Sequence, residues 1–132
     1  MDTQKPEINR RRFDRFLVDY PISYNLKESG QTDTGVAMNL SEGGLLASFF
    51  DRLSVGSELD LEMFYAFDLQ FTSFNVEARI VWKDILETSE AIQYQYGIEF
   101  TNMGKEDKAR LRKLLASMGS TTSYHSREAT LL

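Results

Sequence analysis

Short stretches of alternating apolar and polar residues run through the middle of the chain. In the first stretch every second residue is large and apolar: Phe16, Val18, Tyr20, Ile22 and Tyr24. Similar alternation marks residues 59–63, 74–82 and 94–100, and apolar stretches at 36–40 and 45–49 flank a polar turn. A period of two is typical of strands with one buried face. Six short strands at roughly even spacing predict a mostly β protein, either a small barrel or a sandwich.

Two features interrupt the strand pattern. Pro21 lies inside the first strand, and proline lacks the N–H that a central ladder needs, so we expect an edge position or a bulge there. Residues 26–32, which include Gly30, are expected to form a loop because glycine adopts turn conformations readily. The first strand is therefore predicted to be irregular near Pro21 and to end near residue 26.

The period changes near the C-terminus, where apolar residues recur at i, i+3, i+4 and i+7: Leu111, Leu114, Leu115 and Met118. This spacing predicts one helix with a single apolar stripe, which is either a lid on the barrel or a partner surface. Asn102 or Gly104 is expected to cap its start, and Gly119 is a natural stop. The polar residues 119–132 are predicted to be a disordered tail, and residues 1–8 a flexible N-terminus.

Composition fits a single cytoplasmic domain. The chain has 132 residues and a hydrophobic fraction of 42 %, which suits one globular core. It has no cysteine, which excludes disulfides, thiol catalysis and thiolate metal sites. No stretch approaches the roughly 18 consecutive apolar residues of a membrane span, and the start lacks the apolar stretch of a secretory signal. We therefore expect no membrane span and a cytoplasmic location.

Charge is distributed unevenly along the chain. The net charge is −5, but residues 1–15 carry five basic and three acidic side chains, whereas the rest carries ten basic and seventeen acidic ones. A nucleic-acid binder is expected to show a broad basic face. A small basic cluster on an acidic body instead favours a compact anionic ligand, because a long polyanion would be repelled by that body. Nucleic-acid binding by a small barrel is thus the weaker alternative.

Two short motifs near the front carry candidate chemistry. The first has four arginines in a short segment: Arg10, Arg11, Arg12 and Arg15. The second, N-L-S-E-G-G over residues 39–44, is a polar turn with two glycines. An arginine run alone is most often a solvated patch or a targeting signal, and Asn, Ser and Gly alone form ordinary turns. Their joint occurrence in this order points to a ligand site.

Together the two motifs resemble the pair that marks the PilZ domain family. The pattern R-x-x-x-R is met by Arg11 and Arg15, and D/N-x-S-x-x-G is met by Asn39, Ser41 and Gly44. The resemblance implies a six-stranded antiparallel PilZ-type barrel with one C-terminal α-helix packed across it. It also implies a stand-alone, single-domain member of the family.

Two later segments are similar to strands of the same family. Ile80-Val81-Trp82 resembles the end of one strand, and residues 96–100, with the sequence Y-G-I-E-F, resemble the next. The likeness therefore covers roughly residues 9–118. Trp82 and the tyrosines are expected to be core residues rather than ligand contacts.

The resemblance implies a receptor for the bacterial second messenger cyclic di-GMP, bound as one molecule or as a stacked pair. This ligand is a dianion with two guanine bases. The planar guanidinium of arginine binds phosphate, pairs with the O6/N7 edge of guanine and stacks on a base. The implied ligand residues are Arg10, Arg11, Arg15, Asn39, Ser41 and Gly44, with Arg12 and Gly43 as weaker candidates. Gly44 is expected to let a backbone approach the ligand or to adopt positive φ.

Enzyme motifs are not visible in the sequence. There is no P-loop, zinc spacing or Ser-His-Asp arrangement, and His125, the only histidine, lies in the predicted tail. We expect neither catalysis nor a metal site, and no cofactor besides the ligand. The arginine segment is expected to order on ligand binding and to signal to a downstream protein partner. The alternative is a PilZ-like interaction domain that acts without ligand. The receptor is favoured by the intact motif residues Arg11, Arg15, Asn39, Ser41 and Gly44.

Overall fold

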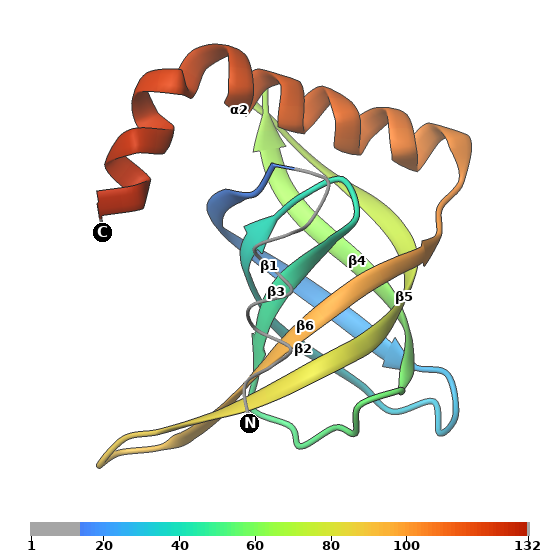
Figure 1. The fold of residues 1–132 in the computed structure, drawn as a ribbon. Coiled ribbons are helices and arrows are strands. Elements are labelled where there is room, and N and C mark those ends of the chain that lie inside the picture. Colours follow the sequence, from blue (N-terminus) through green and yellow to red (C-terminus); the bar gives the residue numbers. More distant parts are fainter. Residues whose placement is uncertain (1–13, 132) are drawn as a thin grey trace.

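The computed structural model describes residues 14–131, with side chains described for residues 14–119. Six antiparallel strands close into a barrel in the order β1-β2-β3-β6-β5-β4, and a helix, α2, crosses one end (Figure 1). The elements are β1 Phe16–Leu26, β2 Thr32–Leu40, β3 Gly44–Phe49, β4 Glu58–Phe67, β5 Gln70–Glu87, β6 Ile92–Asn102 and α2 Lys105–Leu131. The predicted mostly β fold with six strands and one C-terminal helix is confirmed.

The barrel interior is filled by the apolar positions that alternate along the strands. On β4, for example, Leu59, Leu61 and Met63 are buried while the residues between them are less so. Aromatic rings pack inside as well: the ring centroid of Phe49 lies 4.6 Å from that of Tyr24 and 5.3 Å from that of Tyr96. Each such side chain stabilises the fold by about 1.5–3 kcal/mol through removal from water. The alternation read from the sequence thus identifies the inward face of the strands.

Strand β1 leaves regular pairing around Pro21. Its register with β2 shifts between Leu17 and Tyr20, and its pairing with β4 begins only at Ile22. Pro21 faces Val36 of β2 and lies just beyond the β4 ladder, so its missing N–H breaks no bond on that side. The expectation of an edge position or a bulge at this proline is confirmed.

Two turns use left-handed backbone conformations. Gly30, in the predicted loop between β1 and β2, has φ of 76°, which costs glycine little. The turn between β4 and β5 instead places Asp68 and Leu69 at φ of 55° and 66°. Residues with a Cβ resist this conformation by about 1–2 kcal/mol each. The β4–β5 turn is therefore strained, and its Leu69 side chain is fully exposed.

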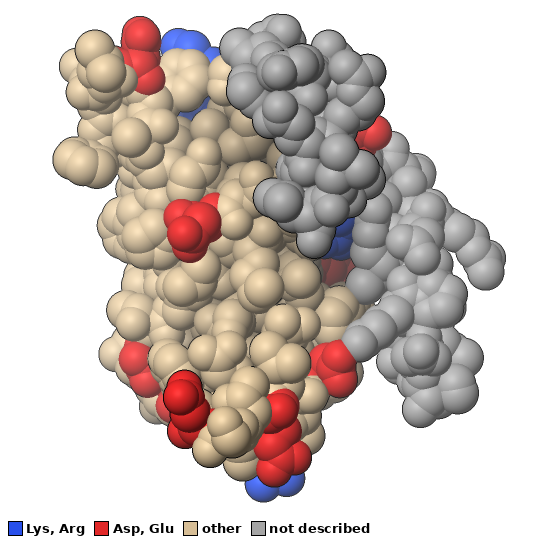
Figure 2. Space-filling model, turned by 90° about the vertical axis from the view of Figure 1, so that its left-hand side faces the viewer, with Lys and Arg blue, Asp and Glu red and all other residues tan. Residues whose placement is uncertain are grey.

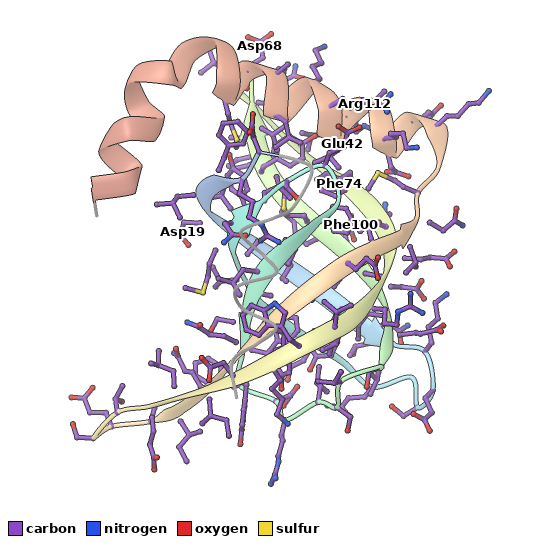
Figure 3. The ribbon with its side chains drawn as sticks, viewed as in Figure 1. Asp19, Glu42, Asp68, Phe74, Phe100 and Arg112 are labelled. Carbon is purple, nitrogen blue, oxygen red and sulfur yellow. The ribbon has the colours of Figure 1, made fainter. Side chains whose placement is uncertain are left out.

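Helix α2 covers the end of the barrel with its apolar stripe. Leu111 and Leu114 are buried, and Leu115 and Met118 pack against the core from half-buried positions. Figure 3 shows Phe74 in the barrel beneath the helix. The stripe therefore forms a lid on the barrel, as the first of the two readings predicted.

The start of α2 decides between the two predicted caps, and its C-terminal end differs from the prediction. The N–H of Lys108 donates to the carbonyl of Gly104 at 2.9 Å, so Gly104 caps the helix start. The helix continues through Gly119 to Leu131, although we expected Gly119 to stop it and a disordered tail to follow. Glycine costs a helix interior only about 1 kcal/mol relative to alanine, so it does not end a helix by itself. Within the described residues, no helix is long and apolar enough to cross a membrane.

Candidate functional site

The two sequence motifs meet at the helix-covered end of the barrel. Arg15 directly precedes β1, and Leu17 of β1 pairs with Asn39 near the end of β2. This register brings the Arg15 side chain to the second motif, where its Nη1 donates to Asn39 Oδ1 at 2.5 Å. Both side chains are half-buried. The contact joins one residue of each motif across 24 positions of sequence.

The other members of the arginine motif lie outside the described residues. These predicted ligand residues are Arg10, Arg11 and the weaker candidate Arg12. Their place in the site therefore stays a prediction, and the structure brings together only Arg15, Asn39 and the turn that follows.

Ser41 holds the turn between β2 and β3 together. Its side chain is only 2 % exposed. Its N–H donates to the carbonyl of Gly44 at 2.9 Å, its Oγ accepts from the N–H of Gly43 at 3.2 Å, and the hydroxyl also lies 3.3 Å from the Gly44 carbonyl. Side chains of this kind stabilise turns by replacing backbone partners. In this state the hydroxyl is therefore occupied by the turn.

Gly44 is required by the barrel itself. A Cβ at this position would lie 2.1 Å from the carbonyl oxygen of Ile98 on β6, far inside van der Waals contact. Positive φ is not the reason for this glycine, because the described glycines with positive φ are Gly30 and Gly56. The close backbone approach that we expected at Gly44 is thus made by a neighbouring strand. Whether the ligand also uses it stays a prediction.

The turn is also tied to the helix. Glu42, between the motif residues, accepts from Nε of Arg112 on α2 at 2.7 Å (Figure 3). A cavity of about 420 Å³ lies beside this ion pair. Its lining comes from the start of β1, the turn and the helix: Asp14, Phe16, Glu42, Arg112, Leu115, Ala116 and Gly119. The cavity is therefore bordered by three elements, the start of β1, the turn and helix α2, and it lies next to the two motifs in sequence.

A row of outward-facing positions extends from Asn39 across the barrel. Asn39 pairs with Leu46 of β3, Leu46 with Gly97 of β6, and Gly97 with Trp82 of β5. Asn39, Leu46 and Gly97 alternate with core residues, so they face outward. The row connects the polar end of the site with a large aromatic side chain.

Trp82 occupies the far end of this row. A Cβ on Gly97 would lie 2.2–2.6 Å from three atoms of the indole, so the ring lies over the bare Cα of this glycine. Trp82 is buried, but it does not belong to the core cluster in which we expected it, because a register shift between Ile80 and Trp82 turns it to the outer face. The sequence shows unbroken alternation up to Trp82, and this hid the shift from sequence reasoning. The available signal was Gly97, because a glycine inside a strand leaves room for a large side chain, here Trp82, on the neighbouring strand.

Metal binding finds no support in the described part of the chain. Within it, no group of three or more His, Asp or Glu side chains is placed to hold a cation. What the described part of the site offers is one arginine, one amide and a firmly built turn, with an aromatic ring at the far end of the outer row. Such groups bind an anion that also carries planar polar edges.

The fold and the site define a small antiparallel barrel with an arginine–asparagine pair at its helix-covered end. The PilZ domain family matches residues 9–117, and the chain belongs to this family. A search of curated proteins found no match.

Solved structures share the fold at low identity. MotI/DgrA, an inhibitor of motility from Bacillus subtilis, is 17 % identical with a TM-score of 0.68, over 86 % of this chain and 53 % of that one. The PilZ domain of YcgR from Escherichia coli, solved with c-di-GMP, is 17 % identical with a TM-score of 0.63, over 85 % and 93 %. The complex of K. pneumonia MrkH with c-di-GMP is 17 % identical with a TM-score of 0.68, over 87 % and 54 %. The chain thus spans about half the length of MotI and MrkH.

Proposed function

We propose that this protein is a receptor for cyclic di-GMP. The observation that carries the proposal is the hydrogen bond between Arg15 and Asn39, which unites the two motifs in one place. Membership of the PilZ family supports it, and so do the neighbours YcgR and MrkH, whose structures contain c-di-GMP. In a chain that binds no ligand, the two motifs would give no reason for an arginine to be held against Asn39 of the second motif.

In the proposed complex the arginines supply charge and planar recognition. Arg11 and Arg15 bind phosphate and guanine edges, Arg10 adds a further guanidinium where two ligand molecules stack, and Arg12 contributes less. Asn39 already orients Arg15 through its amide oxygen, so less side-chain freedom is lost when the ligand arrives. A bound guanine would then extend along the outer row towards Trp82.

The turn residues act mainly by shape. Ser41 and Gly43 fix the backbone of the turn, and Gly44 lets it pass close to β6. The backbone next to Asn39 is then held in a fixed position relative to the barrel. We propose that any direct ligand contact from Ser41, Gly43 or Gly44 is secondary to this role.

Ligand binding is proposed to fix residues 9–16 against the barrel and so create a surface for a downstream protein. Four arginines in a short segment repel one another until a dianion neutralises them. The Glu42–Arg112 pair lies next to the same turn, so the closure would also reach helix α2. Amide exchange of residues 9–16 should slow at least tenfold on addition of cyclic di-GMP. Equal exchange rates with and without ligand would leave a passive binding site.

Isothermal calorimetry tests the receptor directly. We expect cyclic di-GMP to bind with micromolar or tighter affinity, about −8 kcal/mol, and GTP, cyclic GMP and cyclic di-AMP to bind much more weakly. Fluorescence of Trp82, the only tryptophan in the chain, gives a second readout near the site. Absence of heat and of any rise in melting temperature at millimolar ligand would refute the proposal and favour an interaction domain that acts without ligand.

Single substitutions test which arginines contact the ligand. Arg11→Ala and Arg15→Ala should each weaken binding by about 2 kcal/mol or more, because a desolvated contact to an anion is costly to remove. Arg12→Ala should cost less. Arg52→Ala is the matched control, since this exposed arginine lies in the loop between β3 and β4, at the opposite end of the barrel from both motifs. If Arg12→Ala proved the most damaging, the assignment of pocket-facing arginines would be wrong.

A further inference from the structure

The hairpin of β4 and β5 carries exposed apolar side chains around its turn. Leu69 is 102 % exposed and Phe71 is 95 % exposed, and Phe64 on the neighbouring strand is 38 % exposed. Figure 1 shows this turn at the helix-covered end of the barrel. We call residues 64–73 the hairpin tip. A contiguous apolar patch of this kind on a protein surface often marks an interaction site.

The turn of the hairpin tip is built from residues that disfavour its conformation. β4 and β5 stay paired up to Phe67 and Gln70, so Asp68 and Leu69 form the turn by themselves. Both have positive φ, where glycine or asparagine is the usual choice in a two-residue hairpin turn. The strained leucine is also fully exposed, so burial within the monomer does not offset its strain. Strain of this kind is typical of functional segments, and here it presents an apolar side chain to the outside.

The outer face of the hairpin is apolar near the tip and polar further away. Ala66 pairs with Phe71 across the two strands, and both residues are exposed. Further from the turn, Phe64 pairs with Ser73, whose hydroxyl donates to Glu62 at 2.8 Å. The polar groups of this face therefore bind each other, and the apolar groups lie towards the turn.

A groove lies between the hairpin tip and helix α2. Its volume is about 390 Å³, and its lining comes from both elements: Phe64, Phe71, Thr72, Ser73, Asn75 and Arg110. Arg110 forms the charged part of this lining. Its Nη1 lies 3.5 Å from the carboxylate of Asp107, and its side chain remains 47 % exposed. Because a guanidinium has five N–H donors, Arg110 can bind a second carboxylate besides Asp107.

The hairpin tip and the groove are complementary to each other. The tip supplies the projecting side chains of Leu69 and Phe71 and the exposed carboxylate of Asp68. Figure 3 shows Asp68 at this end of the molecule, away from the barrel interior. The groove supplies a hollow with apolar walls and the guanidinium of Arg110. A surface that holds both halves of a contact can bind a second copy of itself around a two-fold axis.

We propose that the hairpin tip and its groove form the interface of a weak homodimer. A two-fold axis near Phe71 sets the two hairpins antiparallel. Leu69 of each copy then lies in the groove of the other copy, and Asp68 of each copy lies beside Arg110 of the other. The contact involves none of the cyclic di-GMP motif residues, so it does not rest on the proposed function.

The size and charge of the surface indicate a reversible dimer. Phe71, Leu69 and part of Phe64 offer roughly 400 Å² of apolar surface per copy, which is at the low end for specific interfaces. The net charge of −5 opposes association. Figure 2 shows carboxylates scattered among uncharged side chains on the face that it views. Dispersed charges of this kind are largely screened at physiological salt, so they weaken the dimer without preventing it.

Sedimentation equilibrium of the full-length protein, without ligand, tests the dimer. The weight-average mass should rise from that of a monomer towards that of a dimer between about 20 µM and 1 mM protein. Phe71→Ser should raise the dissociation constant at least about tenfold. Phe50→Ser is the matched control, because Phe50 is 69 % exposed at the opposite end of the barrel, and it should associate like the parent. A parent protein that stays monomeric at 1 mM would overturn the proposal.

Leu69→Asn separates the interface from the strain of the turn. Asparagine adopts positive φ more readily than leucine, so the dilute, monomeric variant should unfold at a higher temperature than the parent. The same variant should dimerise at least about tenfold more weakly, because it removes the side chain that fills the groove. Unchanged dimerisation of Leu69→Asn would show that the tip does not lie in the groove of the second copy.

Charge reversal tests the contact between Asp68 and Arg110. Asp68→Lys and Arg110→Glu should each weaken the dimer by about fivefold, because like charges then meet across the interface. An equimolar mixture of the two variants should associate like the parent, because both contacts of the mixed dimer again join opposite charges. Circular dichroism checks the fold of each variant. A mixture that associates no better than either variant alone would exclude this pairing and the two-fold arrangement.

Discussion

The two ends of the barrel are closed by different kinds of contact. At one end Leu111 and Leu114 of helix α2 cover the core with apolar side chains. The loop between β3 and β4 lies at the other end (Figure 1). Hydrogen bonds hold this loop in place. The hydroxyl of Tyr96 donates to the carbonyl of Asp51 at 2.8 Å and accepts from the N–H of Leu53 at 2.8 Å.

Further polar contacts fix the same loop. The hydroxyl of Tyr24 donates to the carboxylate of Asp51, and Lys83 Nζ donates to the carbonyl of Leu53 at 3.1 Å. Displacing this loop would leave buried polar groups without partners, which costs roughly 1–3 kcal/mol for each group. Apolar contacts are not directional, so a helix can shift over a core without such a penalty. The polar contacts of the helix, such as that between Arg112 and Glu42, are exposed. We therefore expect the helix end, where the candidate site lies, to shift more readily than the loop end.

The largest loss of stability is expected from a substitution at the helix end. Leu114→Ala should lower the free energy of unfolding by about 2–5 kcal/mol, because it removes a buried side chain and leaves a cavity under the lid. Chemical denaturation measures the change. Leu115→Ala, at a half-buried position of the same helix, is the control and should cost clearly less. Equal losses at the two positions would mean that the helix does not seal the core through its buried stripe.

At the loop end the largest single effect is expected from Tyr96→Phe. The ring keeps its packing, but the Leu53 N–H and the Asp51 carbonyl lose their common partner. We expect a loss of about 1–3 kcal/mol in the free energy of unfolding, with no change in affinity for cyclic di-GMP. A weaker affinity in this variant would show that the two ends are coupled and would contradict the division drawn above.

The loop end should also make stability depend on pH. The hydrogen bond from Tyr24 is the main cause that lowers the pKa of Asp51 below its usual 3.8. Its stabilisation is therefore complete above about pH 4 and is lost as the pH falls through the lowered value. Burial, helped by the bond to Asp51, raises the pKa of Tyr24 above its usual 10.0, so that stabilisation is present below pH 10 and is lost at higher pH.

Denaturation curves at pH values from 2 to 11 measure this dependence. Asp51→Asn should flatten the acid limb, because asparagine does not titrate, and the alkaline limb should remain. An acid limb of unchanged steepness in the variant would place the responsible carboxylate elsewhere.

The smallest effect is expected from the ion pair between the turn and the helix. Glu42→Gln removes the charge opposite Arg112, and exposed pairs of this kind contribute less than about 1 kcal/mol to stability. Glu77→Gln, which removes the partner of Lys27 in an exposed ion pair away from both motifs, is the matched control. We expect similar small losses of stability in both, but a changed affinity for cyclic di-GMP in Glu42→Gln alone. Identical affinities would show that the helix is not linked to the ligand site through Glu42.

Sequence periodicity predicted the strands and the helix well, because both follow from which side chains must leave water. It did not predict where the ladders shift, as between Ile80 and Trp82, because a bulge depends on how the barrel closes. The hairpin of β5 and β6 is also longer than predicted, since its pairing reaches Glu87 and Ile92, beyond the strands predicted at residues 74–82 and 94–100. The helix beyond Gly119 was missed because a glycine was taken as a stop.

The candidate site was less accessible to sequence reasoning than the fold. The motif pair named Arg15 and Asn39, and the structure places them in contact. The roles of Ser41 and Gly44 follow from hydrogen bonds and a strand approach that only coordinates reveal. Arg10, Arg11 and Arg12 lie outside the described residues, so their predicted contacts await the binding experiments.

The glycine at position 44 changes what the second motif can tell about related chains. Because Ile98 O leaves no room for a Cβ, any chain that folds this way needs glycine there, and the buried Ser41 is needed to build the same turn. A descendant that had lost the ligand would be held to both residues by folding alone. The fold does not require Asn39 and the arginines in this way. Under the proposed function, the serine and glycine in a related chain indicate only the shared fold, and the asparagine and arginines are the residues that indicate ligand binding.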